Sequence, residues 1–395
     1  MKALIIGSGI AAVEAALKIR TLQPEAEITL YTREKVLPYR RPALTRMISE
    51  KLSDIQFYLH DKQFYDEKNI HILTDCAVVS IDREKKHVML DDGSLAQYDK
   101  LLIATGGKGF MPPIQGIDLP QVVALREWDD LSEISSMLNE NIRQVVVIGG
   151  GLLGLEIADN LTKKNSDVTV IEACPCMLPK QLDKDGADIL VAAMNRNPRV
   201  KTLYGVFVSH IEGHNKVEGV LTQKGEHIPC DMVIISAGMS SNFELAHSAG
   251  LDVNRAIEAD AGMRTSDPDI FAAGDCAAIN GKRFGMWNPA REQGAVAGAN
   301  MCGKDMAFKP KIYGARLVAF GTKLFSVGDI GLGEGPYKQV CRTDEVNLVY
   351  RKIFFKDDKA CGGILIGDIA AAQRMQNAVE KGFDIKQCEE AEIIC

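Results

Sequence analysis

A glycine-rich turn at the start of the chain limits what the sequence can fold into. The apolar run Ala3 to Ile6 ends in Gly7-Ser8-Gly9, and an Ala-rich segment of high helix propensity follows. This pattern predicts a strand, a tight turn and a helix, with Ala12 small enough for close packing of the helix on the strand. The backbone N–H groups of such a turn, together with the positive end of the helix dipole, favour a pyrophosphate.

The same pattern returns in a fuller form in the middle of the chain. QVVVIGGGLLGLEIADNL begins at residue 144 and has Gly149, Gly151 and Gly154 in complete GxGxxG spacing between a predicted strand and a predicted helix. Glu172 follows at the end of the next strand, DVTVIEA, where an acid accepts ribose hydroxyls in the dinucleotide fold. We therefore expect two dinucleotide sites in one chain.

Further repeats indicate how these two units share the chain. CDMVIISAG, from Cys230 to Gly238, echoes YDKLLIATG, from Tyr98 to Gly106, and IFAAGDC, from Ile270 to Cys276, is a third strand that runs into a glycine. A second dinucleotide-binding unit inserted in the first would explain this order. The expected fold is α/β, with two Rossmann-like domains and a C-terminal α+β domain. The expected boundaries are 1–110 and 233–308 for the first dinucleotide-binding domain, 111–232 for the domain inserted in it, and 309–395 for the C-terminal domain.

Local patterns predict several further elements. Asn69 to Leu95 should be β-structure with a turn at Asp92-Gly93, and Trp128 to Leu138 and Pro289 to Asn300 should be helices. Beyond about Lys309, apolar runs with polar interruptions predict an antiparallel sheet and a terminal helix. That terminal helix should lie near residues 370–381.

Composition excludes several classes of protein. The net charge is −7 with no long basic block, which argues against nucleic-acid binding, and no apolar run approaches the ~18 residues of a membrane span. Lys2 before an apolar run would also open a signal peptide, but Gly7, Gly9 and Glu14 interrupt it. The ten cysteines are scattered, which indicates reduced thiols in a cytoplasmic protein, and Cys388 and Cys395 are expected to be exposed.

Two nucleotide turns suggest a chemical pairing of a nicotinamide donor with a flavin. A flavin converts a two-electron hydride into single electrons, which no side chain can do. Glu172 favours NADH over NADPH, because a carboxylate accepts a hydrogen bond from a free 2′-hydroxyl and repels a 2′-phosphate. Lys180 is the one cation between Glu172 and Leu182 that could offset this repulsion.

With these motifs the whole chain resembles the pyridine-nucleotide–disulfide oxidoreductase superfamily of two-dinucleotide flavoproteins. The loop LPYRRPALTR, 37–46, is similar to that of the branch without a redox disulfide. This branch includes NADH:rubredoxin oxidoreductases, the flavin domains of nitrite reductases, ferredoxin reductases and apoptosis-inducing factor. FSVGDI and GGILIGDI, in the last 75 residues, are most similar to the rubredoxin reductase and nitrite reductase types. The resemblance implies FAD and NADH as cofactors, with FAD on the first domain, 1–110 and 233–308, and NADH on the inserted domain, 111–232.

The resemblance also implies roles for individual residues. It places Glu34 at the adenosine ribose of FAD, although several relatives carry the acid at the position of Arg33. It places Asp275 at the ribityl hydroxyls and Trp287 near the flavin edge, where a purely structural tryptophan is the alternative. The full set of implied cofactor contacts is Gly7, Gly9, Ala11, Ala12, Glu34, Arg41, Arg46, Val78, Ala104, Gly106, Arg126, Gly149, Gly151, Leu153, Gly154, Glu172, Gly238, Gly274, Asp275 and Trp287.

Arg46 and Glu156 are the implied catalytic pair. Relatives have a lysine at the position of Arg46 that pairs with a glutamate beside flavin N5, and Glu156 would be that partner here. Such a pair would hold charge where negative charge develops on the flavin. An arginine in place of lysine is not a neutral exchange, because its planar fork is larger.

The thiol chemistry of the disulfide reductases is absent from the sequence. No cysteine precedes Cys76, and no histidine follows His247. Cys174-Pro-Cys176 could bind a metal or form a strained disulfide, but no second pair is close in sequence, so loop thiols near the NAD adenosine are expected and no metal site is predicted. Cys276 should be a small buried residue.

The sequence thus predicts an NADH-dependent FAD reductase that passes single electrons to rubredoxin, or to ferredoxin, without nucleic acid or membrane. The alternatives are a flavoprotein subunit of a larger iron–sulfur complex, an NADH oxidase that reduces O₂, and a non-enzymatic NADH redox sensor.

Overall fold

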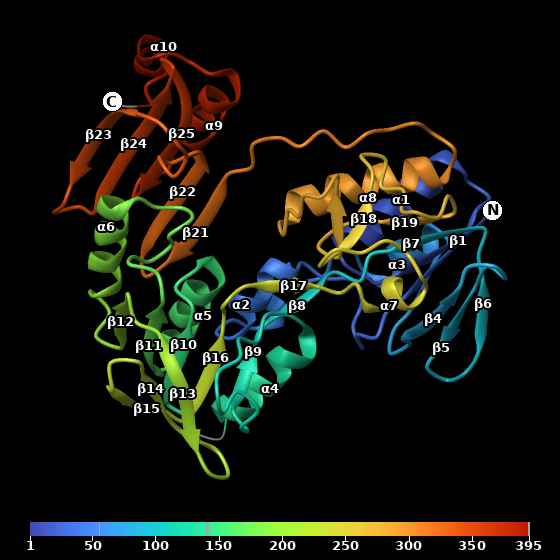
Figure 1. Ribbon diagram of the computed structural model, residues 1–395, viewed down its shortest axis with the longest axis horizontal. Helices are drawn as coiled ribbons and strands as arrows, with labels where there is room; N and C mark the ends of the chain where they lie inside the picture. Colours follow the sequence, from blue (N-terminus) through green and yellow to red (C-terminus); the bar gives the residue numbers. More distant parts are fainter. Residues whose placement is uncertain (55, 140–141, 394–395) are drawn as a thin grey trace. The chain divides into compact units, whose positions relative to one another are not determined.

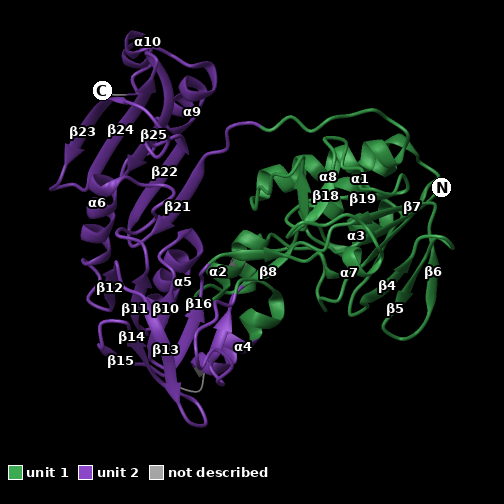
Figure 2. Ribbon diagram, viewed as in Figure 1, with its two compact units in different colours: residues 1–110, 126–132, 238–310 green, residues 111–125, 133–237, 311–395 purple. Residues whose placement is uncertain are grey.

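The computed structural model describes residues 1–54, 56–139 and 142–393, and this part of the chain forms two compact units, each made of three separated stretches (Figure 2). Unit 1 holds residues 1–110, 126–132 and 238–310, and unit 2 holds 111–125, 133–237 and 311–395. The domain boundaries inferred from sequence stay a prediction. The stretch 126–132, which they place in the inserted domain, groups with unit 1.

Unit 1 is built on a parallel five-stranded sheet with the order β19-β7-β1-β2-β3, of which Figure 1 labels β19, β7 and β1. The strands β1, β7 and β19 are apolar runs buried on both faces, as expected of a parallel sheet covered by helices, whereas the edge strand β3 is partly exposed. They are β1 (Lys2–Ile6), β2 (Glu27–Tyr31), β3 (Ile70–Leu73), β7 (Lys100–Ile103) and β19 (Ile270–Ala272).

Two helices of unit 1 approach each other until their backbones touch. α1 (Ile10–Leu22) and α8 (Trp287–Met301) lie side by side (Figure 1). A Cβ on Gly294 would lie 2.2 Å from the carbonyl oxygen of Ala11, and one on Gly298 would lie 2.4 Å from that of Ala15. Small residues on both helices therefore permit this contact, and they hold the helix that follows the first glycine turn in place.

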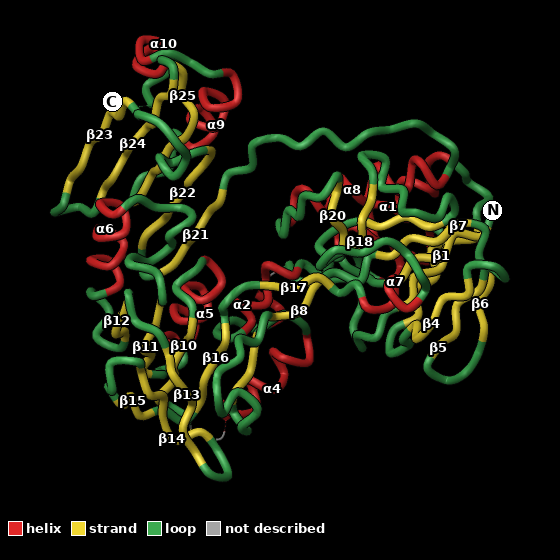
Figure 3. Tube along the Cα trace, in the orientation of Figure 1, coloured by secondary structure: helices red, strands yellow, loops and turns green. Residues whose placement is uncertain are grey.

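The rest of unit 1 consists of short elements around this sheet (Figure 3). β4 (Val78–Asp82), β5 (His87–Leu90) and β6 (Leu95–Gln97) form the expected antiparallel sheet, with Gly93 at φ +84° in the turn. The others are α2 (Leu44–Met47), α3 (Lys62–Glu67), α7 (Glu244–Ser248), the 3-10 turns Arg41–Ala43 and Leu52–Asp54, the pair β8 (Gly107–Gly109) and β17 (Met239–Ser241), and the pair β18 (Ile257–Ala259) and β20 (Ala277–Ile279). α4 (Trp128–Asn139) begins in unit 1.

Unit 2 contains a second parallel five-stranded sheet with the order β12-β11-β10-β16-β9. Its elements are β9 (Val122–Ala124), β10 (Gln144–Ile148), β11 (Asp167–Glu172), β12 (Val200–Tyr204), β16 (Met232–Ile235), α5 (Leu152–Lys163) and α6 (Lys184–Met194), with an antiparallel sheet of β13 (Val208–Gly213), β14 (Val217–Thr222) and β15 (His227–Pro229). The predicted pair of Rossmann-like units is confirmed, whereas α6 and the β13–β15 sheet were not predicted from the sequence.

The last part of unit 2 is the predicted α+β domain. It is an antiparallel sheet with the order β21-β22-β25-β24-β23, covered by helices. Its elements are β21 (Ala315–Ala319), β22 (Thr322–Gly328), β23 (Lys338–Asp344), β24 (Val349–Lys356), β25 (Lys359–Ile366), α9 (Ala372–Lys381) and α10 (Ile385–Glu390). α9 confirms the expected terminal helix.

Cys388 corrects one expectation about the C-terminal tail. It lies in α10 and is fully buried in the core with Phe325 and Met375, because the tail folds back as a helix instead of remaining an exposed polar segment. Cys395 lies outside the described residues. Among the described helices, none is both long and apolar enough to cross a lipid bilayer.

A buried lysine links the C-terminal sheet of unit 2 to the start of α6. Lys352, on β24, is 8% exposed, and its Nζ donates to Asp183 Oδ2 at 2.6 Å. The Tyr350 hydroxyl donates to the same carboxylate at 2.8 Å, and the carboxylate also caps α6 by accepting from the Gly186 N–H at 3.1 Å. Burial alone would lower the pKa of Lys352, but the hydrogen bond and charge of Asp183, together with the charge of Asp185, outweigh it and the pKa is raised.

Loss of this link should destabilise unit 2. Lys352→Met would leave Asp183 partly buried without its cation, so we expect the free energy of unfolding to fall by about 3 kcal/mol. Denaturant titration would measure it. The matched control is Lys338→Met, whose exposed pair with Asp358 should contribute less than about 1 kcal/mol. Equal effects of the two variants would contradict this role of Lys352.

Candidate functional site

The first glycine turn has the geometry of a pyrophosphate cradle. Gly7 has φ +111°, and its N–H donates to the Tyr31 carbonyl at 2.8 Å. A Cβ there would lie 2.3 Å from the carbonyl oxygen of Ala104, so the turn passes directly against the end of β7. A Cβ on Gly9 would meet nothing within 4 Å, and α1 begins at the next residue. The open side of the turn and the helix N-terminus therefore fit an anionic group.

A hydroxyl contact ties this turn to β2. The Ser8 hydroxyl donates to Thr32 Oγ1 at 3.0 Å, and both residues are buried. The Glu34 N–H donates to the same Thr32 oxygen at 3.3 Å. The residues just beyond β2 are thereby held beside the glycine turn. Serine and threonine at these positions carried no signal in the sequence pattern, because their contact joins residues 24 positions apart.

The second turn repeats this geometry in unit 2. Gly149 has φ +120°, and a Cβ there would lie 2.3 Å from the Ser236 carbonyl oxygen. A Cβ on Gly151 would meet nothing within 4 Å, whereas one on Gly154 would lie 2.0 Å from the Gly149 carbonyl oxygen. The three glycines thus serve the turn, the open side and the helix–strand contact, as the complete motif predicts. Leu153, in the first turn of α5, is 38% exposed.

Glu172 is fixed at the end of β11 by backbone groups. Its Oε2 accepts from the Gly150 N–H and its Oε1 from the Cys174 N–H, both at 2.8 Å. The buried Met177 packs where a Cβ on Gly150 would be, since its Sδ lies 2.4 Å from that position. The carboxylate is therefore held beside the second glycine turn, where the sequence pattern expected the acid of the NADH ribose.

The two cysteines that follow Glu172 are thiols in a surface loop. Cys174 is exposed, and Cys176 is half-buried. Burial and the neighbouring Glu172 carboxylate raise the pKa of both thiols, which favours their neutral form. Among the described residues there is neither a disulfide nor a group of three side chains placed to hold a metal ion.

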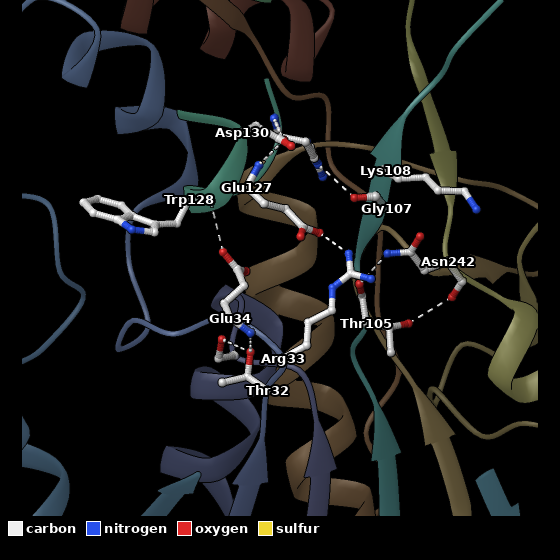
Figure 4. Close-up of polar contacts among 12 residues, drawn as sticks. Thr32, Arg33, Glu34, Thr105, Gly107, Lys108, Glu127, Trp128, Asp130 and Asn242 are labelled. Carbon is white, nitrogen blue, oxygen red and sulfur yellow. Dashed lines mark hydrogen bonds and ion pairs between the residues drawn. The ribbon is translucent and has the colours of Figure 1, made fainter. Parts of the chain in front are cut away.

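Glu34 is the centre of a buried polar cluster in unit 1. It is 8% exposed; the Tyr39 hydroxyl donates to its Oε2 and Arg41 Nη2 to its Oε1, each at 2.6 Å. The Trp128 N–H also donates to Oε2 at 3.3 Å (Figure 4). Burial alone would raise the pKa of Glu34, but the Arg41 guanidinium and the Tyr39 hydroxyl lower it below its ordinary value. Both carboxylate oxygens are thus occupied by protein donors.

Arg126 joins several of the residues expected at the flavin. Its guanidinium forms an ion pair with Asp275 and donates to the Gly107 carbonyl at 3.2 Å, while its own carbonyl accepts from Arg41 at 2.5 Å. Gly274, which precedes Asp275 in the chain, lies so close to α1 that a Cβ on this glycine would be 3.2 Å from the Ala11 Cβ. Arg41, Arg126, Gly274 and Asp275 therefore belong to one cluster beside the first turn.

Arg46 and Glu156 lie in different units. Arg46, on α2, is half-exposed and makes a two-pronged contact with Glu50, at 3.0 Å to Oε1 and 2.6 Å to Oε2. Glu156 lies on α5, and its carbonyl accepts from Asn160. The Arg46–Glu156 pair therefore stays a prediction.

The remaining expected residues of unit 1 border the same sheet. Val78 and Trp287 are partly buried against its core. Ala104 and Gly106 follow β7, and Gly238 precedes β17 and accepts from the Phe110 N–H at 3.0 Å. Cys276 is fully buried near the carbonyls of residues 103 and 273, as expected of a small core residue.

The sequence patterns did not reveal several polar contacts between distant stretches of unit 1. Arg33 Nη2 donates to Glu127 Oε1 at 2.5 Å (Figure 4). Thr105 and Asn242 exchange two hydrogen bonds of 2.9 Å, hydroxyl to carbonyl and amide to carbonyl. Asp130 accepts from the backbone N–H of Glu127 at 2.8 Å. The first two contacts join residues 94 and 137 positions apart, which no local pattern reveals.

Comparison with known proteins agrees with this geometry. Residues 1–294 match the family model described as pyridine nucleotide-disulphide oxidoreductase, and residues 315–383 match the rubredoxin NAD+ reductase C-terminal domain. The chain is 30% identical to NADH-rubredoxin oxidoreductase of Clostridium acetobutylicum, over 97% of this chain and 96% of that protein.

Two further relatives show how far the likeness extends. The chain is 31% identical to nitrite reductase [NAD(P)H] of Bacillus subtilis over 99% of its own length, but it spans only 48% of that protein. A solved NAD-dependent persulfide reductase from A. fulgidus superposes with a TM-score of 0.89 at 28% identity, covering 99% of this chain and 79% of that one. The chain thus corresponds to about half of the Bacillus relative.

Glu34→Gln tests the buried cluster. Removal of the negative charge would leave the Arg41 guanidinium without its partner, so we expect the free energy of unfolding at pH 7 to fall by about 3 kcal/mol. Since the folded-state pKa of Glu34 is lowered, its contribution is present above the ordinary value of 4.5 and is lost as pH falls through the folded-state pKa.

The variant should therefore lose less stability than the wild type as the pH falls below the ordinary value of 4.5. Denaturant titrations at several pH values would measure both curves. Glu25→Gln, at an exposed loop position, is the matched control and should follow the wild type. Parallel curves for Glu34→Gln and the wild type would contradict the inferred role of Glu34.

Proposed function

Because this chain belongs to the pyridine nucleotide-disulphide oxidoreductase family, we propose that it is an FAD-dependent enzyme that oxidises NADH and passes electrons to a small iron protein. Rubredoxin is the first choice of acceptor. One observation carries this choice: the C-terminal domain, 315–383, matches the domain of rubredoxin NAD+ reductases, and this chain covers a rubredoxin oxidoreductase almost end to end.

The residues of unit 1 fit FAD. The open turn at Gly9 and the N-terminus of α1 would hold the pyrophosphate. Asp275, anchored by Arg126, would bind the ribityl hydroxyls, and Gly274 permits the approach. When bound, a flavin accepts a hydride and releases electrons one at a time.

The residues of unit 2 fit NADH. The open turn at Gly151 and the N-terminus of α5 would hold its pyrophosphate. Glu172, fixed by two backbone N–H groups, would accept from the ribose hydroxyls. The Arg46 cation and the Glu156 carboxylate are proposed to hold charge beside the flavin.

The electrons are proposed to leave without a thiol intermediate. No cysteine lies in the first 75 residues, where the disulfide reductases carry theirs. Burial raises the pKa of Cys276, the cysteine next to Asp275, and disfavours a thiolate there. A cytoplasmic location is proposed because the nine described cysteines are all unpaired, as in a reducing compartment.

A second candidate is a flavoprotein part of a larger redox complex. The chain is 31% identical to nitrite reductase [NAD(P)H] of Bacillus subtilis and spans about half of it, which supports a role beside an iron–sulfur partner. The two candidate functions differ in the electron acceptor that supports turnover of NADH.

An acceptor panel tests the proposal. The purified full chain, loaded with FAD, should oxidise NADH and reduce rubredoxin with a kcat/KM well above that for ferredoxin or O₂. Stopped-flow absorbance at the flavin band would follow reduction by NADH, and the absorbance of each acceptor would follow its own reduction. A protein that binds no FAD would contradict the whole proposal, and fast flavin reduction with no turnover on rubredoxin would contradict the acceptor.

Glu172→Ala tests the nicotinamide site. Loss of the carboxylate removes both its hydrogen bond to the 2′-hydroxyl and its repulsion of a 2′-phosphate, so the preference for NADH over NADPH in kcat/KM should fall by about 10-fold or more. Asp167→Ala, at the other end of β11, is the control and should keep the wild-type preference. An unchanged preference in Glu172→Ala would place the selecting group elsewhere.

A further inference from the structure

The end of β2 carries two neighbouring residues in different surroundings. Glu34 points into unit 1, is 8% exposed and accepts from Tyr39, Arg41 and the Trp128 N–H. Arg33, one residue earlier, has a side chain that is 61% exposed. A carboxylate has about four acceptor positions, and three of those of Glu34 already have protein donors. A ribose at this edge would meet residue 33 more readily than Glu34.

A second carboxylate lies beside Arg33. Glu127 Oε1 accepts from Arg33 Nη2 at 2.5 Å, and the Glu127 side chain remains 22% exposed (Figure 4). Its other oxygen, Oε2, has no hydrogen-bond donor in the described part of the chain. Glu127 is thus a carboxylate with one oxygen anchored and one oxygen able to accept from a ligand.

The backbone of Glu127 is held as firmly as its side chain. The N–H groups of Arg126 and Glu127 both donate to Asp130 Oδ2, at 2.7 and 2.8 Å. The Arg126 guanidinium is anchored on Asp275 and the Gly107 carbonyl. Because the Trp128 N–H is bound by Glu34, the residues on both sides of Glu127 are fixed.

The position of this pair matches a known requirement of the fold. In a dinucleotide-binding unit, an acid near the end of the second strand accepts the adenosine ribose hydroxyls. The Ser8–Thr32 contact holds the residues after β2 beside the first glycine turn. Here residue 33 is a cation, and it holds a carboxylate that comes from 94 positions further along the chain.

We propose that Glu127, positioned by Arg33, is the residue that accepts the adenosine ribose hydroxyls of FAD, while Glu34 holds the surrounding loops together. The assignment rests on the proposed FAD function. Arg33 acts as a positioning residue: it fixes Glu127 Oε1 and leaves Oε2 directed to the ligand. In the usual arrangement a single acid at the end of the second strand accepts the ribose hydroxyls. In unit 1 this acceptor is built from two separate stretches, one with Arg33 and one with Glu127.

A ligand comparison tests the proposal directly. The full-length apoprotein is titrated with FAD and with an FAD analogue whose adenosine ribose lacks both hydroxyls, and binding is followed by flavin fluorescence. The wild type should bind the analogue about 10- to 100-fold more weakly, as expected for loss of hydrogen bonds to a charged acceptor. Glu127→Gln should bind FAD more weakly and discriminate little between the two ligands.

Three further variants separate the recognition of ribose from folding. Arg33→Gln should lose part of the discrimination, because Glu127 is no longer held. The double variant Arg33→Glu with Glu127→Arg exchanges the two charges and should restore it, since the acid then stands at the end of β2 itself. Glu244→Gln, which alters an exposed pair with Lys108, should match the wild type. Thermal unfolding of each apoprotein reports its folding independently.

The outcomes are distinct. The assignment would be overturned if a folded Glu127→Gln variant still discriminated fully between FAD and the analogue, or if a folded Glu34→Gln variant did not discriminate between them. In either case, FAD binding by the wild type would still support the proposed function. Failure of the charge exchange to restore discrimination would also count against it. A wild type that binds neither ligand would overturn the proposed function together with the assignment.

Discussion

The close passage of backbone against backbone at the two glycine turns is the constraint on which both cofactor sites depend. At Gly7 and again at Gly149, the chain leaves a strand and crosses the end of the neighbouring parallel strand with no room for a Cβ. This contact fixes the direction in which the next helix starts, and with it the open face at Gly9 and at Gly151. The Ser8–Thr32 contact lies beside the first of these turns, and the two backbone N–H groups that bind Glu172 lie beside the second.

Much of this architecture is readable from the sequence, because it follows local rules. Apolar runs that end in glycines predicted the parallel strands, and the repeat of the pattern predicted two units, one inserted in the other. The acid at the end of β11 was expected from its spacing, and the structure holds Glu172 beside the second turn through the two N–H groups that flank it in space. These features depend on neighbours within about 30 residues, which motif and periodicity describe well.

What the sequence could not provide is the set of contacts between distant stretches. Arg126 contacts Asp275 across 149 positions, and Trp128 contacts Glu34 across 94, so the stretch 126–132 belongs with unit 1 although the stretch before it, 111–125, belongs to unit 2. Neighbouring residues at a strand end also face different surroundings. Arg33 and Glu34 differ by one position, yet one is largely exposed and the other buried, and only the packed loops decide which. The buried Lys352, which joins β24 to α6 through Asp183, was hidden for the same reason.

The division of unit 1 into three stretches has a consequence for the order in which the protein is made. The first glycine turn is synthesised within the first ten residues, but the helix that packs against α1 is α8, at 287–301, and the strand that completes the sheet is β19. A nascent chain therefore carries the first cradle for most of translation without its partner helix. Unit 2 is also incomplete until late in translation, because Asp183 can bind Lys352 only after the C-terminal sheet has left the ribosome. Both halves of the enzyme should consequently mature late and close together in time, so a ribosome stalled before residue 270 would present neither of them in finished form.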